Sequence, residues 1–300
     1  MTDADEPRRE GYFAILKRAA KQASADHVTS LAAALAYYAF LAIPATLLVA
    51  AGLFGLYAGP DTVTTVIDKL NTIVPEQVTD LINQSLTRLT EKQGTSITLI
   101  AVGGVLALWS LSGAMQNVIW ALNTAYGREE TRGFVRRRIV AAAMAVFVLI
   151  ASGLVLGLLV LGPQLSRWIG NAVGDSSAVH VVWWASQWPI LIGGLLLANA
   201  VVYNLGPNVE HRKWRFVTFG SVFAVAVWLL ASGAFAFYVS RFGSYNKAWG
   251  SLSAVVIMLT WLWLSSVALL LGAEINAETE RTRERQREGP GTREPAAAEA

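Results

Sequence analysis

Carboxylate and amide side chains stand at the end of the last apolar stretch of the sequence. In LLLGAEINAETE, residues 269–280, the leucines are followed at once by Glu274, Asn276 and Glu278. A carboxylate at a membrane edge is either a working group, such as a gate, or the first solvated residue after a span. A negative charge is also unfavourable at the C-terminal end of a helix dipole. We therefore expect either a helix that continues to about Glu280 or a Glu274 that is paired.

The partner expected for Glu274 lies in the basic segment YGREETRGFVRRRIV, residues 126–140. Three of its arginines are adjacent: Arg136, Arg137 and Arg138. We expect Glu274 to turn inward to an arginine of this segment, and Glu278, one turn further on, to stay in water. The three cations also suit an anionic lipid surface, where each contributes about 1 kcal/mol. This lipid contact together with a topology signal is one interpretation, and specific binding of a ligand is the alternative.

Polar side chains inside the apolar stretches form a second candidate site. Within residues 96–122 and just beyond, Trp109, Gln116 and Asn123 lie along one helical stripe, and a stripe of amides must face the protein interior or water. Pro44 is expected to kink its span and to free a backbone carbonyl. Two interpretations stay open: interhelical hydrogen bonds of roughly 1 kcal/mol each, or a polar cavity that handles a substrate. The candidates are Tyr37, Pro44, Gln116, Asn117, Asn123, Asn199 and Tyr203.

The residue patterns of common enzyme sites do not occur in the sequence. His27, His180 and His211 fall at three separate loops or span ends, and the chain has no cysteine, so no metal-ligand spacing is present. Phosphate-binding, dinucleotide-binding and nucleophile-elbow motifs are missing as well. The only acidic cluster lies in the C-terminal tail among arginines that neutralise it. We predict a protein that is not an enzyme, has no metal or cofactor, and does not bind nucleic acid.

Long apolar stretches must position these candidate residues. Of the 300 residues, 54% are hydrophobic and 15% charged, with a mean hydropathy of +0.45, whereas charged residues approach a quarter of a soluble domain. Each stretch can supply the roughly 20 residues that cross a bilayer core of about 30 Å. The sequence therefore predicts an all-α membrane protein with six transmembrane helices. The expected spans are 31–57, 96–122, 140–162, 186–205, 217–240 and 252–273.

Lysine and arginine are distributed unevenly between the two sides of these spans. Eighteen of the 24 lie before the first span, in the second and fourth loops, or in the tail. By the positive-inside bias, both termini are predicted to be cytoplasmic. The N-terminal residues lack the apolar core of a signal peptide, so the first span is expected to direct membrane insertion.

The segments around the spans divide the chain into three parts. Residues 1–29 are expected to hold a cytoplasmic interfacial helix, with an apolar stripe at helical spacing. Residues 30–277 form the six-helix transmembrane domain, and residues 278–300 a charged, largely disordered cytoplasmic tail. The first external loop is patterned as two amphipathic helices broken at Pro75, lying on the outer surface or capping a cavity. The stripe of the interfacial helix consists of Phe13, Leu16, Ala20 and Ala23.

Four motifs together carry a resemblance to a known family. They are AAALAYYAFLAIP, WSLSGAMQNVIWALNTAYG, YNLGP and WGSLSAVVIMLTWLWLSSVALLLGAEINAE. With these motifs, residues 10–277 resemble the YihY/BrkB family of bacterial inner-membrane proteins, formerly called ribonuclease BN. The chain departs from the family pattern at Trp249 and Ser253, where tyrosine and glycine are usual, and at Asn204, where arginine is common. The resemblance implies a six-span, multi-pass protein of the bacterial cell inner membrane, linked to envelope integrity and to movement of lipid or another amphiphile.

Two function classes follow from these observations. The first is a passive or ion-coupled transporter, or flippase-like carrier, of a lipid or other amphiphile, whose partners are membrane lipids with anionic headgroups at the cytoplasmic face. The second is a non-transporting membrane scaffold for envelope integrity. The ribonuclease name conflicts with the residue inventory above, so we predict no such activity.

Overall fold

The described part of the computed structural model consists of helices. It comprises residues 11–57, 96–173, 177–209, 214–242 and 251–288, and no strand occurs in these ranges. Runs of alanine and leucine favour a helix, because in an apolar solvent every backbone polar group must be satisfied within the segment. The helices are α1 (Tyr12–Ala25), α2 (Val28–Tyr57), α5 (Ser96–Tyr126), α6 (Phe134–Val173), α7 (Ser177–Leu205), α8 (Phe219–Phe242) and α10 (Ser251–Glu288).

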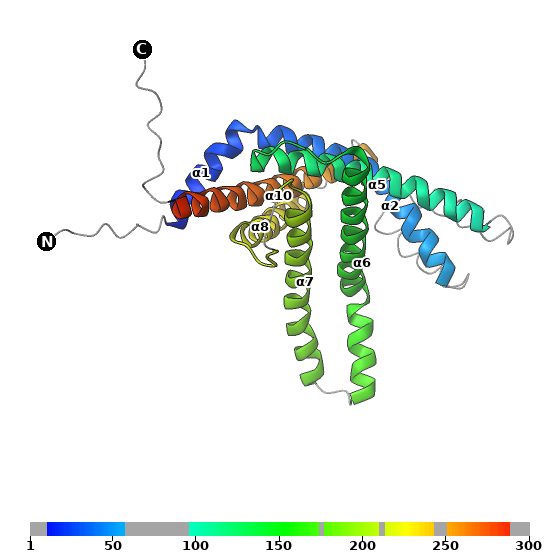
Figure 1. Cartoon of the computed structure of the whole chain (residues 1–300). Helices are drawn as coiled ribbons and strands as arrows, with labels where there is room; N and C mark the ends of the chain where they lie inside the picture. Colours follow the sequence, from blue (N-terminus) through cyan, green and yellow to red (C-terminus); the bar gives the residue numbers. More distant parts are fainter. Residues whose placement is uncertain (1–10, 58–95, 174–176, 210–213, 243–250, 289–300) are drawn as a thin grey trace, which may run out of the picture.

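Helix α10 is the centre of the assembly. Helices α1, α2, α5 and α8 all pack against it, while α6 packs against α5 and α7, and α7 contacts α8. Figure 1 shows α6 and α7 side by side, projecting from the layer formed by α1, α2, α5 and α10. This arrangement brings the C-terminal ends of α7 and α10 close to the first residues of α1 and α8.

Glycines allow α8 to cross α10 at very short distance. A Cβ atom added at Gly220 would overlap the carbonyl oxygen of Gly272, and one added at Gly272 would overlap the hydroxyl oxygen of Tyr203. The crossing lies beside a core of fully buried side chains, because the small residues let larger ones close around them. Members of that core include Ile119, Leu122, Met144, Tyr203 and Ala273.

The prediction of six spans is not confirmed. Four described helical segments are long and apolar enough to cross a membrane. A fifth results only if α1 and Val28–Pro44 count together as one span across a bend of 67°. Helix α5 covers the predicted span 96–122 without being one of the four. Hydropathy measures apolar length but not where a helix bends or which way it runs. The four segments are Phe134–Leu154, Ala185–Leu205, Phe219–Arg241 and Leu252–Gln286.

The N-terminal helix is present, and it packs on the protein through a stripe that shares only Ala23 with the stripe predicted to face the membrane. Ile15, Ala19 and Ala23 are buried in α1, whereas Phe13 is 81% exposed. The protein-facing stripe is set by packing against α10, which the periodicity of α1 alone does not specify. Between α1 and α2, His27 adopts a left-handed backbone with φ of 51°, which turns the chain.

Two predicted features lie at the limits of the described residues. The helix expected to reach about Glu280 does so, since α10 continues to Glu288. The residues from 278 to 288, which we expected to begin a largely disordered tail, are therefore helical. The two amphipathic helices predicted on either side of Pro75 lie outside the described residues.

Candidate functional site

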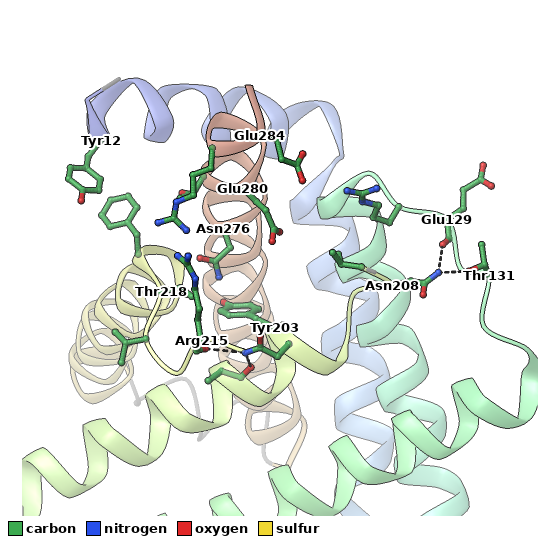
Figure 2. Close-up of a pocket in the computed structure, with 18 residues that line it drawn as sticks. Tyr12, Glu129, Thr131, Tyr203, Asn208, Arg215, Thr218, Asn276, Glu280 and Glu284 are labelled. Carbon is green, nitrogen blue, oxygen red and sulfur yellow. Dashed lines mark hydrogen bonds between the residues drawn. The ribbon is translucent and has the colours of Figure 1, made fainter. Parts of the chain in front are cut away.

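A polar cavity of about 650 Å³ lies where the ends of α7 and α10 meet the first residues of α1 and α8. Figure 2 shows side chains from all four helices, and from the loops after α5 and α7, around it. The cavity is lined by Tyr12, Arg128, Glu129, Thr131, Ala200, Tyr203, Asn204, Asn208, Val209, Arg215, Val217, Thr218, Phe219, Asn276, Thr279, Glu280, Arg283 and Glu284.

Asn276 carries the least satisfied polar group of this cavity. The residue is 6% exposed, and its Oδ1 accepts a hydrogen bond of 3.0 Å from the backbone N–H of Gly220. Its Nδ2 is buried and has no hydrogen-bond partner in the described residues. A buried amide donor without a partner costs about 1–3 kcal/mol. The close α8–α10 crossing fixes the oxygen, and the nitrogen stays buried at the cavity wall without a partner in the described residues.

Arginines and glutamates are present in equal number in the lining. Arg128, Arg215 and Arg283 come from three separate segments, and only their grouping in the fold makes them neighbours of one cavity. Within the described residues, the guanidinium groups of Arg128 and Arg215 make no ion pair or hydrogen bond. The sequence does not reveal this grouping, because each of the three arginines belongs to a different basic segment.

The wall formed by the loop after α7 is held by asparagine side chains. Asn208 donates from its backbone N–H to Oδ1 of Asn123 at 2.7 Å, and from Nδ2 to Oγ1 of Thr131 at 2.7 Å. Asn204 donates from Nδ2 to the carbonyl oxygen of Arg215 at 3.1 Å. These bonds join the loops after α5 and α7 into one structure, so the cavity wall is preorganised.

A half-buried ion pair supports this wall on the side away from the cavity. Nε of Arg132 lies 2.7 Å from Oε1 of Glu130, and its Nη2 donates to the carbonyl oxygen of Gly206 at 2.7 Å. Asn123 donates from Nδ2 to Oε2 of Glu130 at 2.9 Å. The hydrogen bond from Arg132, with a smaller contribution from Asn123, lowers the pKa of Glu130 against the opposing effect of burial. Asn123, predicted as a cavity residue, is 3% exposed and serves this network.

Glu274 turns inward as predicted, but the predicted arginine partner is not found among the described residues, and the prediction that Glu278 stays in water is wrong. Glu278 is buried, with Oε1 2.5 Å from Nε of Arg18, and it lies 3.7 Å from Nη1 of Arg281. Glu274 is 1% exposed, and neither of its oxygens has a hydrogen-bond partner in the described residues. The physical reason is the docking of α1, which covers this face of α10 and brings its own arginine. Arg18 and Glu278 are 260 residues apart, so no local pattern could reveal the pair.

Only Tyr203 of the seven predicted polar span residues lines the cavity. Its hydroxyl donates to the carbonyl oxygen of Leu269 at 2.7 Å, an interhelical hydrogen bond. Asn117 and Asn199 instead donate to the carbonyl oxygens of Gly113 and Leu195, one turn back in their own helices. Tyr37 is 55% exposed on α2, Pro44 lies within the same helix, and Gln116 is partly buried on α5.

The predicted arginine cluster lies in the first turns of α6 and does not line the cavity. Arg138 donates from Nη2 to the carbonyl oxygen of Trp109 at 2.8 Å, and its guanidinium carbon lies 3.7 Å from the centre of the Trp109 ring. Arg136 is exposed, and Nε of Arg137 is buried with no hydrogen-bond partner in the described residues. A guanidinium over an indole face is a cation–π contact, which holds Arg138 against the helix.

Comparison with known proteins places the chain in a family. The model of the virulence factor BrkB family matches residues 19–297. A protein of Bacillus subtilis named putative ribonuclease-like protein YfkH is 33% identical over 192 residues, covering 64% of this chain and 70% of that protein. A UPF0761 membrane protein of Pseudoalteromonas translucida is 26% identical over 266 residues, with 84% and 81% covered.

Coverage differs among these relatives. A UPF0761 membrane protein of Methylibium petroleiphilum is 28% identical over 208 residues, which is 69% of this chain but 48% of that protein. No solved structure matches the chain. The family match extends over nearly the whole chain and agrees with its apolar helices, so this chain is a membrane protein that belongs to the virulence factor BrkB family.

Proposed function

We propose that the protein is a carrier, transporter or flippase-like, that moves a lipid or another amphiphile across the bacterial inner membrane. The observation that supports this most is the cavity of about 650 Å³ at the ends of α7 and α10. Such a volume is typical of small-ligand sites in proteins. Its polar lining suits a headgroup, and the apolar faces of the adjoining spans suit hydrocarbon chains.

The charge distribution supports a cytoplasmic position for this cavity. Its walls come from segments that carry most of the lysine and arginine in the sequence, and such segments stay on the cytoplasmic side of a membrane. Arg128 and Arg215 place two guanidinium groups at the cavity, where they can bind phosphate oxygens in a fork-like geometry. We infer that a headgroup enters here from the inner leaflet.

Leaflet exchange in reconstituted liposomes tests the carrier directly. The liposomes contain fluorescent analogues of lipids found in the inner membrane. A membrane-impermeant quencher is added, and the fraction of analogue that it reaches is followed with time. We expect faster exchange with the protein than in empty liposomes, and a loss of about tenfold on Arg215→Gln, since a charge-assisted hydrogen bond to phosphate is removed.

Arg241→Gln is the matched control, because Arg241 lies at the opposite end of α8 over the Phe237 ring. Its exchange rate should equal that of the unchanged protein. If no envelope lipid exchanges faster than in empty liposomes, the carrier proposal is wrong. Crosslinking that traps one stoichiometric protein partner would then favour the non-transporting scaffold.

A further inference from the structure

We propose that Glu274 and Asp26 form a proton-binding site, in which one proton shared by the two carboxyl groups holds helix α1 against α10. The site lies where the end of α1 packs on α10, next to the turn at His27. Neither carboxyl group lines the cavity, so the site stands apart from the proposed transport. Its ligand is a proton, and its consequence is the docking of one helix.

The side chain of Glu274 is buried without the partners that an ionised carboxylate needs. The residue is 1% exposed, and neither Oε1 nor Oε2 has a hydrogen-bond partner in the described residues. A carboxylate that is withdrawn from water and left unpaired is costly, and such a group normally takes up a proton instead. In a membrane protein, an ionisable side chain in such surroundings is a candidate functional group.

The carboxyl group of Asp26 can accept a hydrogen bond from that proton. Asp26 directly follows the last residue of α1, and its side chain lies within hydrogen-bonding reach of Glu274. Two ionised carboxylates are both acceptors, which explains why the oxygens of Glu274 have no partner although a carboxyl group lies beside them. One proton turns the pair into a donor and an acceptor, and it removes the repulsion between two like charges.

The surroundings of the two groups place the proton on Glu274. Nε2 of Gln22 donates to Oδ1 and Oδ2 of Asp26, at 3.0 and 3.1 Å, so the oxygens of Asp26 already act as acceptors. Asp26 is half-buried and the adjacent His27 is exposed, whereas Glu274 is fully buried. The hydroxyl of protonated Glu274 therefore donates to Asp26, and on release the proton passes by way of Asp26 to water.

The other charged groups around Glu274 are engaged elsewhere. Glu278, one turn further along α10, accepts a hydrogen bond from Nε of Arg18 and lies 3.7 Å from Nη1 of Arg281. Nη2 of Arg281 lies 3.5 Å from the carbonyl oxygen of Ala125 on α5. Within the described residues, no cation therefore makes a hydrogen bond to Glu274.

A proton fits this site better than a metal ion does. A hard metal cation needs several oxygen ligands, and the described part of the chain contains no group of three or more His, Asp or Glu side chains that could hold one. One turn before the two carboxyl groups, Ala23 and Leu270 belong to an apolar cluster shared with α2 and α5. Repulsion between two negative charges is strong beside such a cluster. Loss of the proton should therefore release the end of α1 from α10.

Infrared spectroscopy of the full-length protein in nanodiscs detects the proton. A protonated carboxyl group has a C=O stretching band that an ionised one lacks. We expect this band at neutral pH, although a glutamate in water ionises near about pH 4.3. It should disappear in Glu274→Gln and remain in Glu284→Gln, which removes an exposed carboxyl group of the same helix. Absence of the band from the unchanged protein, or its persistence in Glu274→Gln, would overturn the site.

Asp26→Asn tests whether the proton is shared. The amide of an asparagine can donate to an ionised Glu274, so the pair no longer needs a proton. The band should then vanish at a pH lower by about one unit or more than in the unchanged protein. An unaltered band would show that burial alone protonates Glu274, which would overturn the sharing. Sodium ions added at constant pH should leave the band in place, and its loss would identify a metal cation as the ligand instead.

Spin labels measure the docking of α1. Lys21→Cys on α1 and Gln286→Cys on α10 place two labels at exposed positions of a chain that has no cysteine. The distance between the labels should lengthen as rising pH removes the band. Glu274→Gln, whose amide donates to Asp26 as a protonated carboxyl group does, should keep the shorter distance at every pH. A distance that stays constant while the band is lost would overturn the effect on α1. Neither measurement follows lipid movement, so the carrier proposal stands or fails separately.

Discussion

At the scale of single residues, two glycines determine how closely the helices beneath the cavity approach. Gly220 lies so near α10 that an added Cβ would come 2.6 Å from Cγ of Asn276 and would overlap the carbonyl oxygen of Gly272. The bond from the backbone of Gly220 to Asn276 exists only because of this approach. The orientation of the Asn276 amide on α10 therefore depends on residue 220 of α8 having no side chain.

Gly220→Ala should destabilise the protein by about 1–3 kcal/mol, because backbone atoms of α10 must shift to admit the methyl group. Gly233→Ala is the matched control on the same helix, where an added Cβ meets nothing within 4 Å. That change should instead stabilise by up to about 1 kcal/mol through helix propensity. Thermal unfolding in detergent measures both, and equal melting temperatures for the two variants would contradict the close crossing.

Glu130 predicts a specific dependence of stability on pH. Arg132 and Asn123 hold its folded-state pKa below the ordinary value of 4.5. The stabilisation, about 2 kcal/mol for a charge-assisted pair, is fully present above pH 4.5 and disappears as the pH falls through the lowered folded-state value.

Thermal unfolding of Glu130→Gln and of the unchanged protein between pH 7 and about pH 3 measures this dependence. The variant should melt lower near neutral pH, and the gap should close below pH 4.5 as the native carboxylate takes up a proton. Glu129→Gln, at an exposed neighbour, should stay within about 0.5 kcal/mol throughout. A gap independent of pH would show that the charge of Glu130 does not contribute.

At the scale of elements, helix α1 matters because it covers the C-terminal half of α10. Arg18 bonds both Glu278 and Oγ1 of Thr282, the latter at 3.1 Å, and the stripe of Ile15, Ala19 and Ala23 packs beneath. The same docking places Tyr12 at the cavity rim. Helix α1 therefore forms one edge of the cavity.

Arg18→Gln should loosen α1 from α10 without unfolding the spans. Glu278 keeps Arg281 and Arg285 within 4 Å, at 3.7 and 3.8 Å, so the loss should be about 1–2 kcal/mol. Hydrogen–deuterium exchange of the α1 amides should then rise by roughly tenfold. Lys17→Gln, at an exposed neighbouring position, is the control and should leave exchange unchanged. Unchanged exchange in Arg18→Gln would mean that packing alone holds α1.

At the scale of the whole molecule, the distribution of lysine and arginine predicts that both chain termini lie on the cytoplasmic side of the membrane. The sequence has no cysteine, so a single introduced cysteine reports the side of the membrane without labelling of native thiols. Cysteines at Lys17 and Arg285 should react with an impermeant maleimide only from the cytoplasmic side, and one at Arg241 only from the outside. Labelling of Lys17→Cys and Arg285→Cys from opposite sides would refute the shared location of the termini.

The helical, membrane-bound character of the protein was predictable from composition, because apolar runs of span length leave few alternatives in a bilayer. The extension of α10 past Glu280 is one of the two alternatives that the dipole argument at Glu274 left open. Tyr203 was predicted as a polar span residue and Asn276 as part of a headgroup or cytoplasmic lock site, and both line the cavity. Such inferences succeed because burial, periodicity and charge bias are local properties of a sequence.

Pairings between distant segments were decided by the tertiary structure alone. The turn at His27 directs α1 back onto α10, which brings Arg18 to Glu278. The packing of α8 against α10 brings Arg215 and Asn276 to the same cavity. Hydropathy does not encode either helix direction. The arginine partner predicted for Glu274 is absent for the same reason, because the described fold does not place an arginine of residues 126–140 within hydrogen-bond distance of it. The sequence determines which residues are charged, but helix packing determines which neighbour compensates each charge.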